Sequence, residues 1–128
     1  MNRIVLDASA LLAVIGDEPG AEKLTPDLLA RAVASAVNLA EVQTKLVSRG
    51  WTSDQAWDDA TSPVREVLSF DEAQARIAGD LVTHTRQVGL SLGDRACLAL
   101  GIALNAPVYT AEKAWKILKI NVKVNLLR

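Results

Sequence analysis

Short apolar runs alternate with longer segments of helical periodicity along the whole chain. The runs of three or four residues favour β-strands, and the longer segments favour helices. The expected strands cover residues 3–6, 32–34, 67–70, 107–109 and 122–124. The expected helices cover residues 8–15, about 20–30, 36–49, about 53–62, 71–86, 91–105 and 111–118. Regular alternation of this kind predicts an α/β fold, with a parallel sheet flanked by helices on both faces.

Polar and small residues mark the limits of the predicted helices. Asp7 precedes one helix and Gly16 ends it, while Ser35 and Gly50 bound another, and Pro63 ends or kinks a third. In parallel sheets, ligands bind outside the carboxyl ends of the strands. Polar residues that directly follow a predicted strand are therefore the first candidates for a functional site.

Length and composition favour one domain over residues 1–128. Half of the residues are apolar, and only five are aromatic, which suits helices packed on a sheet. The single cysteine, Cys97, excludes an internal disulfide and lies in an apolar run, where we expect a buried thiol. Asp7 interrupts the first apolar run, and no stretch approaches the ~18–20 apolar residues of a membrane span. We therefore expect a cytoplasmic protein with no membrane attachment.

Charge is unevenly distributed around a net value of −1. Residues 112–128 carry five basic residues against one acid, whereas the first 111 residues carry nine basic and fourteen acidic residues. The basic residues of this last segment are Lys113, Lys116, Lys119, Lys123 and Arg128. They either face phosphates or form a solvated helix surface, and composition alone favours the solvated surface.

Two acidic residues have a structural and a functional interpretation each. Asp7 follows the first strand, so it caps the next helix or points into the ligand crevice at the edge of the sheet. Glu41 lies within a helix, where it pairs with Lys45 four residues on. Alternatively, the largely apolar surroundings of Glu41 require that its carboxylate bind a partner or an ion.

Two further acids occupy helix starts. Asp94 completes a capping box with Ser91, and Glu112 follows Thr110 in the first turn of a predicted helix, where it complements the helix dipole. All four acids also converge on the carboxyl edge of one sheet if the predicted elements are correct. Clustered carboxylates cannot all remain ionised without a cation, and oxygen ligands suit Mg²⁺ or Mn²⁺. The only histidine, His84, lies in a polar stretch and is expected at the surface.

Four motifs carry a resemblance to a known family. Residues 4–12 (IVLDASALL), 35–42 (SAVNLAEV), 92–100 (LGDRACLAL) and 108–115 (VYTAEKAW) resemble, in order and spacing, the four acidic motifs of PIN-domain nucleases. Total length and motif spacing are similar to those of the VapC toxins of bacterial and archaeal toxin–antitoxin pairs. The resemblance covers the whole chain.

The resemblance implies a PIN-like fold with a central parallel sheet of about five strands. It also implies a metal-dependent endoribonuclease that uses Mg²⁺ or Mn²⁺ and leaves a 5′-phosphate and a 3′-hydroxyl. By motif, the catalytic and metal-binding residues are Asp7, Glu41, Asp94 and Glu112, and Ser9 and Thr110 support them. Glu112 departs from the family, which more often has Asp there.

The resemblance further implies an RNA substrate, a VapB-like antitoxin and a homodimer. The antitoxin would place an apolar helix in a groove around Leu11, Leu12, Ile15, Leu28 and Leu29, and an Arg on the acidic cluster. Arg95 and Lys113 neighbour the acids in sequence. They either contact phosphate or balance local charge.

Two rival interpretations remain open at this point. In a receiver-like signalling module, Asp71 would accept a phosphoryl group, and Thr110 and Lys113 would assist it. Such modules carry paired acids after the first strand, whereas here Ala8 follows Asp7. The second rival is a catalytically inactive PIN-fold binding protein. Metal-dependent RNA cleavage separates the nuclease from both.

Overall fold

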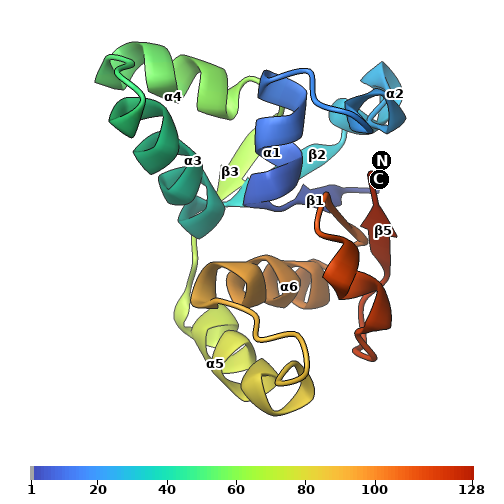
Figure 1. Ribbon diagram of the computed structural model, residues 1–128. Coiled ribbons are helices and arrows are strands. Elements are labelled where there is room, and N and C mark those ends of the chain that lie inside the picture. The colour runs from blue at the N-terminus through green and yellow to red at the C-terminus, as the bar shows by residue number, and fades with distance from the viewer. Residues whose placement is uncertain (1) are drawn as a thin grey trace.

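The computed structural model describes residues 2–128 and contains one sheet of five parallel strands (Figure 1). Along the sheet the strand order is β3-β2-β1-β4-β5. The strands are β1 (Ile4–Leu6), β2 (Ala32–Ser35), β3 (Glu66–Leu68), β4 (Val108–Thr110) and β5 (Val124–Leu126). The predicted parallel sheet of about five strands is confirmed, and β1 lies at its centre between β2 and β4.

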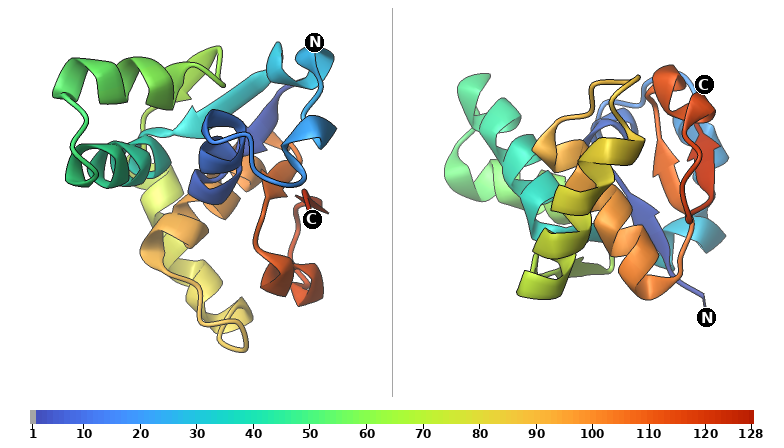
Figure 2. Two further views of the ribbon diagram at one scale, coloured as in Figure 1. Left: turned by 45° about the horizontal axis from the view of Figure 1, so that its top comes forward. Right: turned by 90° about the horizontal axis from the view of Figure 1, so that it is seen from below.

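Helices cover both faces of the sheet (Figures 1 and 2). One face carries α1 (Ala8–Ile15), α3 (Ala36–Ser48) and α4 (Ser53–Thr61), and the other carries α5 (Glu72–Asp80) and α6 (Leu92–Leu104). Successive side chains of β1 alternate between the two faces. Ile4 and Leu6 pack with the first group of helices, and Val5 packs with Cys97 and Leu98 of α6. The buried Cys97 thiol agrees with the prediction.

The helix predicted over residues 20–30 is wrong as a single element. It divides into the 3₁₀ turn η1 (Ala21–Lys23) and the short α2 (Pro26–Leu29). Thr25 starts α2 by accepting a hydrogen bond from the Leu28 N–H, and Pro26 suits the first helical position. Before η1, Gly20 has φ +93° and its Cα lies so close to the Leu127 backbone that no side chain fits there.

Two more predicted helices are shorter in the structure. The segment predicted over 71–86 ends as α5 at Asp80 and continues as the 3₁₀ turn η2 (Leu81–His84), which inserts Leu81 into the core against α6. The segment predicted over 111–118 is a 3₁₀ helix, η3 (Lys113–Ile117), that buries Trp115. His84 is exposed, as expected.

Two edge strands are displaced from their predicted positions. The strand predicted over 67–70 forms one residue earlier and ends two residues earlier, and the strand predicted over 122–124 forms two residues later. In β5, alternating Val122, Val124 and Leu126 fit either position, and pairing of Val124 with Val108 of β4 decides between them. Within residues 2–128, no helix is long and apolar enough to cross a membrane.

Candidate active site

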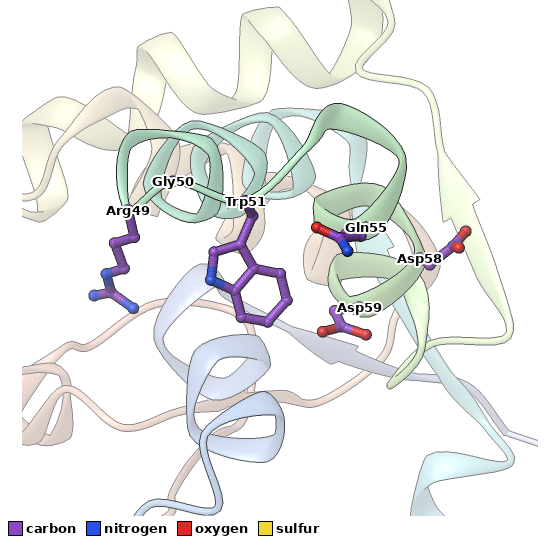
Figure 3. Close-up of a pocket in the computed structure, with 6 residues that line it drawn as sticks. All are labelled: Arg49, Gly50, Trp51, Gln55, Asp58 and Asp59. Atoms are coloured by element: carbon purple, nitrogen blue, oxygen red, sulfur yellow. The ribbon is translucent and has the colours of Figure 1, made fainter.

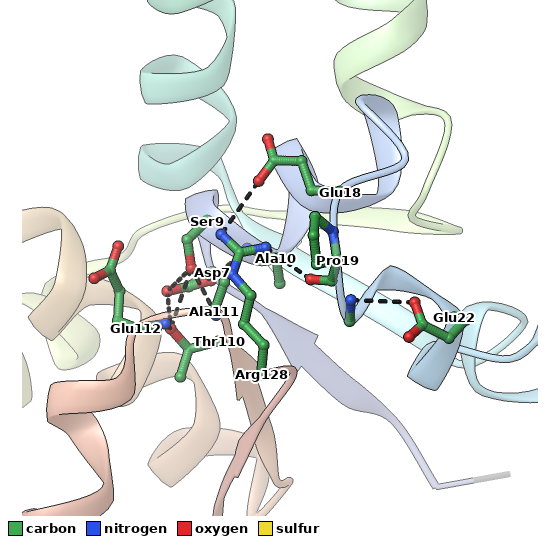
Figure 4. Close-up of polar contacts among 11 residues, drawn as sticks. Asp7, Ser9, Ala10, Glu18, Pro19, Glu22, Thr110, Ala111, Glu112 and Arg128 are labelled. Carbon is green, nitrogen blue, oxygen red and sulfur yellow. Dashed lines mark hydrogen bonds and ion pairs between the residues drawn. The ribbon is translucent and has the colours of Figure 1, made fainter.

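Asp7 lies at the carboxyl end of β1 and begins α1 (Figure 4). One carboxylate oxygen, Oδ1, accepts hydrogen bonds from the Ala10 N–H and the Ser9 hydroxyl, both at 2.8 Å. The other, Oδ2, accepts from the Thr110 hydroxyl at 2.6 Å. Thr110 ends β4, the neighbour of β1 in the sheet. Asp7 therefore caps a helix and also lies at the carboxyl edge of the sheet, as both interpretations of the sequence required.

The direction of the two hydroxyl bonds is determined by the backbone. The Ala111 N–H donates to Ser9 Oγ at 2.9 Å, and the Glu112 N–H donates to Thr110 Oγ1 at 3.0 Å. Each hydroxyl has a single proton, which is then available for Asp7. Two chains of donors thus run from the backbone after β4 to the Asp7 carboxylate and hold it in one orientation.

Burial opposes the negative charge of Asp7. The side chain is 2% exposed, and desolvation raises the pKa of Asp7 from 3.8 to about 6. Hydrogen bonds from Thr110, Ala10 and Ser9 lower this pKa, and the charge of nearby Asp94 raises it. A bound cation would favour the ionised form.

Glu41 lies on α3 and faces the start of α6. The Asn38 side-chain amide donates to Glu41 Oε1 at 2.8 Å and to the Gly93 carbonyl at 3.0 Å. A Cβ added to Gly93 would lie 2.7 Å from Glu41 Cδ, so a side chain at this position would displace the carboxylate from where it lies. The predicted pair with Lys45 is not among the ion pairs of residues 2–128. Asn38 takes the place of that partner.

Asp94 forms the predicted capping box. Its Oδ2 accepts from the Ser91 N–H at 3.0 Å, and Ser91 Oγ accepts from the Asp94 N–H at 3.1 Å. The carboxylate is nevertheless only partly exposed and lines the same cavity as Asp7. Capping and a place in the cavity are compatible because a carboxylate has two oxygens.

Glu112 differs from its predicted setting. It precedes η3, which begins at Lys113, and it makes no capping bond with its side chain. Glu112 therefore lies at the position before the helix and not in its first turn, where it was predicted. Its backbone N–H donates to Thr110 Oγ1, and its exposed side chain lines the same cavity as Glu41.

One cavity of about 330 Å³ brings the four acids together at the carboxyl edge of the sheet. Its lining residues are Asp7, Ala8, Ser9, Leu12, Glu18, Glu41, Lys45, Arg49, Asp94, Glu112 and Arg128. The buried Cys97 thiol lies close enough to three of these acids for their charges to affect its pKa. Burial raises the pKa of Cys97, and the charges of Asp7, Asp94 and Glu41 raise it further.

The donor set suits a hard divalent cation, because all four candidates supply carboxylate oxygens. Within residues 2–128, however, no three acidic, histidine or cysteine side chains lie close enough to hold one ion as they stand. Asp7 is fixed by its hydrogen bonds, whereas Glu41, Asp94 and Glu112 retain partly or fully exposed side chains. These three side chains therefore have more freedom to change rotamer than Asp7 does.

The cavity is also lined by charged residues that the sequence did not place there. Lys45 and Arg49 lie one and two turns beyond Glu41 on α3, so helical periodicity alone could have placed them on its face. Arg128 lines the cavity from the end of the chain, donates to the Pro19 carbonyl at 2.8 Å and pairs with Glu18 at 3.3 Å (Figure 4). No local signal in the sequence indicates this last contact.

Other predicted contacts lie outside the cavity. Arg95 turns toward α5, where its guanidinium donates to the Ala78 carbonyl at 2.8 Å. Lys113 is exposed, and neither residue lines the acidic cavity. Arg95 therefore joins two helices in this structure, and a phosphate contact by Lys113 stays a prediction.

The predicted antitoxin groove also needs correction. Leu11 is fully buried in the core, so it is not available to a partner. The other four residues, Leu12, Ile15, Leu28 and Leu29, are partly buried and pack against that core.

The position of Asp71 argues against the receiver-like interpretation. Asp71 follows β3, an edge strand, and its Oδ1 caps α5 by accepting from the Gln74 N–H at 2.8 Å. Asp71 is exposed and does not line the acidic cavity. Thr110 instead binds Asp7, which does line that cavity. A phosphoacceptor assisted by Thr110 is therefore excluded by the fold.

The family assignment follows from residues 4–120, which match the PIN domain profile. The chain belongs to the PIN-domain family. The match spans all four motifs, so the family resemblance seen in the sequence is confirmed, and no curated protein matches the chain in sequence.

Solved structures of VapC-type proteins share the PIN fold of this chain. A chain of DNA-bound VapBC from Salmonella typhimurium is 13% identical, with a TM-score of 0.77 and complete coverage of both chains. One from VapBC2 of Rickettsia felis, bound to a promoter DNA fragment, is 24% identical, with a TM-score of 0.74 and coverage of 96% of this chain and 97% of that one. VapC20 of Mycobacterium tuberculosis, described as a sarcin–ricin loop cleaving toxin, is 16% identical, with a TM-score of 0.70 and coverage of 94% and 98%.

Proposed function

We propose that this PIN-domain protein is a metal-dependent endoribonuclease that acts as the toxin of a toxin–antitoxin pair. The observation that carries the proposal is the single cavity that Asp7, Glu41, Asp94 and Glu112 all line. Four carboxylates at the carboxyl edge of a parallel sheet have no structural need to share one cavity, and their mutual repulsion costs stability. Such an arrangement is typical of a cation site that serves catalysis.

The four carboxylates would hold Mg²⁺ or Mn²⁺. The ion would lower the pKa of a bound water and neutralise charge on the scissile phosphate. Asp7 supplies the fixed ligand, because Ser9 and Thr110 orient it. Asn38 orients Glu41 through the hydrogen bond from its side-chain amide.

Positive side chains complete the proposed site. Lys45 and Arg49 lie on the α3 wall of the cavity, where they would bind phosphates on either side of the scissile bond. Attack of water in line with the leaving 3′-oxygen would yield a 5′-phosphate and a 3′-hydroxyl. The single histidine, exposed on η2, offers no basis for attack by a 2′-hydroxyl.

Relatives with the same fold support the toxin assignment. Several are described as VapBC or toxin–antitoxin complexes, and VapC20 as a toxin that cleaves the sarcin–ricin loop. We infer a VapB-like antitoxin for this chain, with an Arg that binds the acidic cavity and is favoured there by the buried Asp7 and the three other carboxylates that line it. A homodimer and a cytoplasmic location remain part of the proposal.

The test is cleavage of RNA by the purified protein with Mg²⁺, with Mn²⁺ and with EDTA. We expect cleavage only with metal, loss of cleavage in Asp7→Asn and Asp94→Asn, and full activity in Asp54→Asn, an exposed acid on α4 outside the cavity. Undiminished cleavage by Asp7→Asn would overturn the site. Absence of cleavage by the wild-type protein, with folding intact, would identify an inactive PIN-fold binding protein instead.

The toxin role needs its own experiment. Expression of the protein alone should arrest growth, and co-expression with a small protein encoded beside it should restore growth and give a copurifying complex. A protein that is harmless alone and binds no such neighbour would be a free-standing PIN nuclease.

A further inference from the structure

A second cavity adjoins the acidic one. It has a volume of about 470 Å³ and is lined by Arg49, Gly50, Trp51, Gln55, Asp58 and Asp59 (Figure 3). Arg49 lines both cavities, so the two lie on either side of this residue at the end of α3. An RNA strand bound in the acidic cavity beside Arg49 therefore lies within reach of the second cavity.

The centre of the second cavity is an aromatic ring. Trp51 packs against the core below it and is only partly buried. Figure 3 shows its indole lying between the Arg49 side chain and Asp59, above α1. A fixed indole of this kind provides a surface on which an unstacked nucleobase can stack.

The two walls of this cavity carry opposite charges. The α3 wall ends in Arg49, whereas the α4 wall carries Asp58 and Asp59, and α4 contains no basic residue. Phosphates are attracted to the first wall and repelled by the second. A nucleotide bound here would therefore place its phosphate at Arg49 and direct its base toward the acids.

The polar groups of the α4 wall match one base best. Gln55 Oε1 accepts from the Thr52 N–H at 3.3 Å, which leaves the Gln55 amide NH₂ free to donate. Asp58 and Asp59 can only accept while they are ionised. Guanine offers two adjacent donors, N1–H and the N2 amino group, to a carboxylate, and its O6 accepts from an amide.

We propose that this cavity is a nucleotide subsite that binds a guanine of the RNA substrate next to the cleaved bond. Trp51 stacks on the base, Asp59 and Gln55 bind its edge, and Arg49 binds its phosphate. Asp59 is the better of the two acids, because it is partly buried whereas Asp58 is exposed. The subsite rests on the proposed ribonuclease function and adds to it a source of sequence preference.

Binding is measured with Asp7→Asn, which retains the RNA uncleaved, in a Trp57→Phe background that removes an exposed indole. The probes are short uridine oligoribonucleotides with a single internal guanosine, inosine or adenosine. We expect the guanosine probe to quench Trp51 fluorescence and bind most tightly, and inosine, which lacks the N2 amino group, to bind at least about fivefold more weakly. The remaining tryptophan, Trp115, is buried in the other core and serves as a constant background.

Matched variants separate the roles of the lining residues. Asp59→Asn should abolish the difference between guanosine and inosine, and Asp54→Asn on the same helix should retain it. Arg49→Gln should weaken all probes alike and reduce the salt dependence of binding by about one phosphate contact. Arg76→Gln, an exposed residue of α5, should do neither.

Two results would overturn the proposed guanine subsite without contradicting the proposed nuclease function. One is metal-dependent cleavage by the wild-type protein with no preference for guanosine and no change in Asp59→Asn. The other is Trp51 fluorescence that responds to the antitoxin and not to any RNA, which would make this cavity part of the protein interface. Absence of any cleavage by the wild-type protein would instead defeat the proposed function itself.

Discussion

Thr110 donates its hydroxyl proton to Asp7 across 2.6 Å, although the two residues are 103 positions apart in the chain. Each ends one of two adjacent parallel strands, β4 and β1. The bond therefore joins the first and fourth acidic motifs at the point where the sheet presents its carboxyl edge. It also places a donor on the oxygen of Asp7 that the helix cap leaves free.

Thr110→Val removes this donor with little change of shape. We expect a loss of about 1–3 kcal/mol in the free energy of unfolding, because Asp7 Oδ2 loses its shorter hydrogen bond and keeps only that from Ser9 at 3.0 Å, and because the Glu112 N–H loses its partner. RNA cleavage should fall as the carboxylate loses its orientation. Thr83→Val, at an exposed site on η2, is the control. Equal stability of the two variants in urea would show that the bond to Asp7 contributes nothing.

The raised pKa of Asp7 predicts the pH dependence of stability in the metal-free protein. In the folded state the pKa is about 6, whereas the ordinary value is 3.8. Between these values the folded state binds more protons than the unfolded state, so stability falls as pH rises from about 4 to above 6. Asp7→Asn cannot ionise and should be more stable than wild type at pH 7 by up to about 3 kcal/mol, less the cost of the one hydrogen bond that its amide nitrogen cannot accept.

Thermal unfolding at pH 4 and pH 7 with EDTA measures this difference. The melting temperature of Asp7→Asn should exceed that of wild type at pH 7 and approach it at pH 4. A lower melting temperature for the variant at pH 7 would mean that the ionised carboxylate is already stabilised by its hydrogen bonds alone.

Divalent metal should reverse the order of the two proteins. Mg²⁺ or Mn²⁺ that binds the folded site raises the melting temperature of wild type in proportion to the logarithm of its concentration above Kd. Asp7→Asn lacks the fixed ligand and should show little response. A titration followed by differential scanning fluorimetry checks this, with Ca²⁺ as a comparison for the size of the site. An identical response of both proteins would place the metal elsewhere.

Gly93 tests the position of Glu41. A side chain at Gly93 would meet the Glu41 carboxylate, so Gly93→Ala must displace it. We expect cleavage to fall at least about tenfold, with the helix itself unharmed. Gly79→Ala, in α5 with open space around the new methyl group, should keep full activity and gain up to about 1 kcal/mol in stability. Full activity in Gly93→Ala would show that cleavage does not depend on the position of Glu41.

The sequence determined the elements and their order, because local periodicity and capping residues decide where strands and helices form. Helix α1 has its predicted limits of Ala8 and Ile15, and α6 forms behind the predicted capping box of Ser91 and Asp94. Periodicity failed over residues 20–30, where the chain leaves the helical conformation at Leu24 and starts again behind the Thr25 cap.

The candidate acids were also visible in the sequence, but their relationships were not. Local rules explained Asp94 as a cap and Glu41 as a partner of Lys45, and the first holds while the second does not. Only the folded chain shows that Asn38 and Gly93 position Glu41, because those contacts join α3 to α6 across 55 residues. Tertiary packing also explains why Asp7 is buried, why its pKa is raised and why it binds Thr110. Sequence assigns each residue to an element, whereas distances between elements depend on how their apolar faces pack, and that packing alone brought the four carboxylates into one cavity.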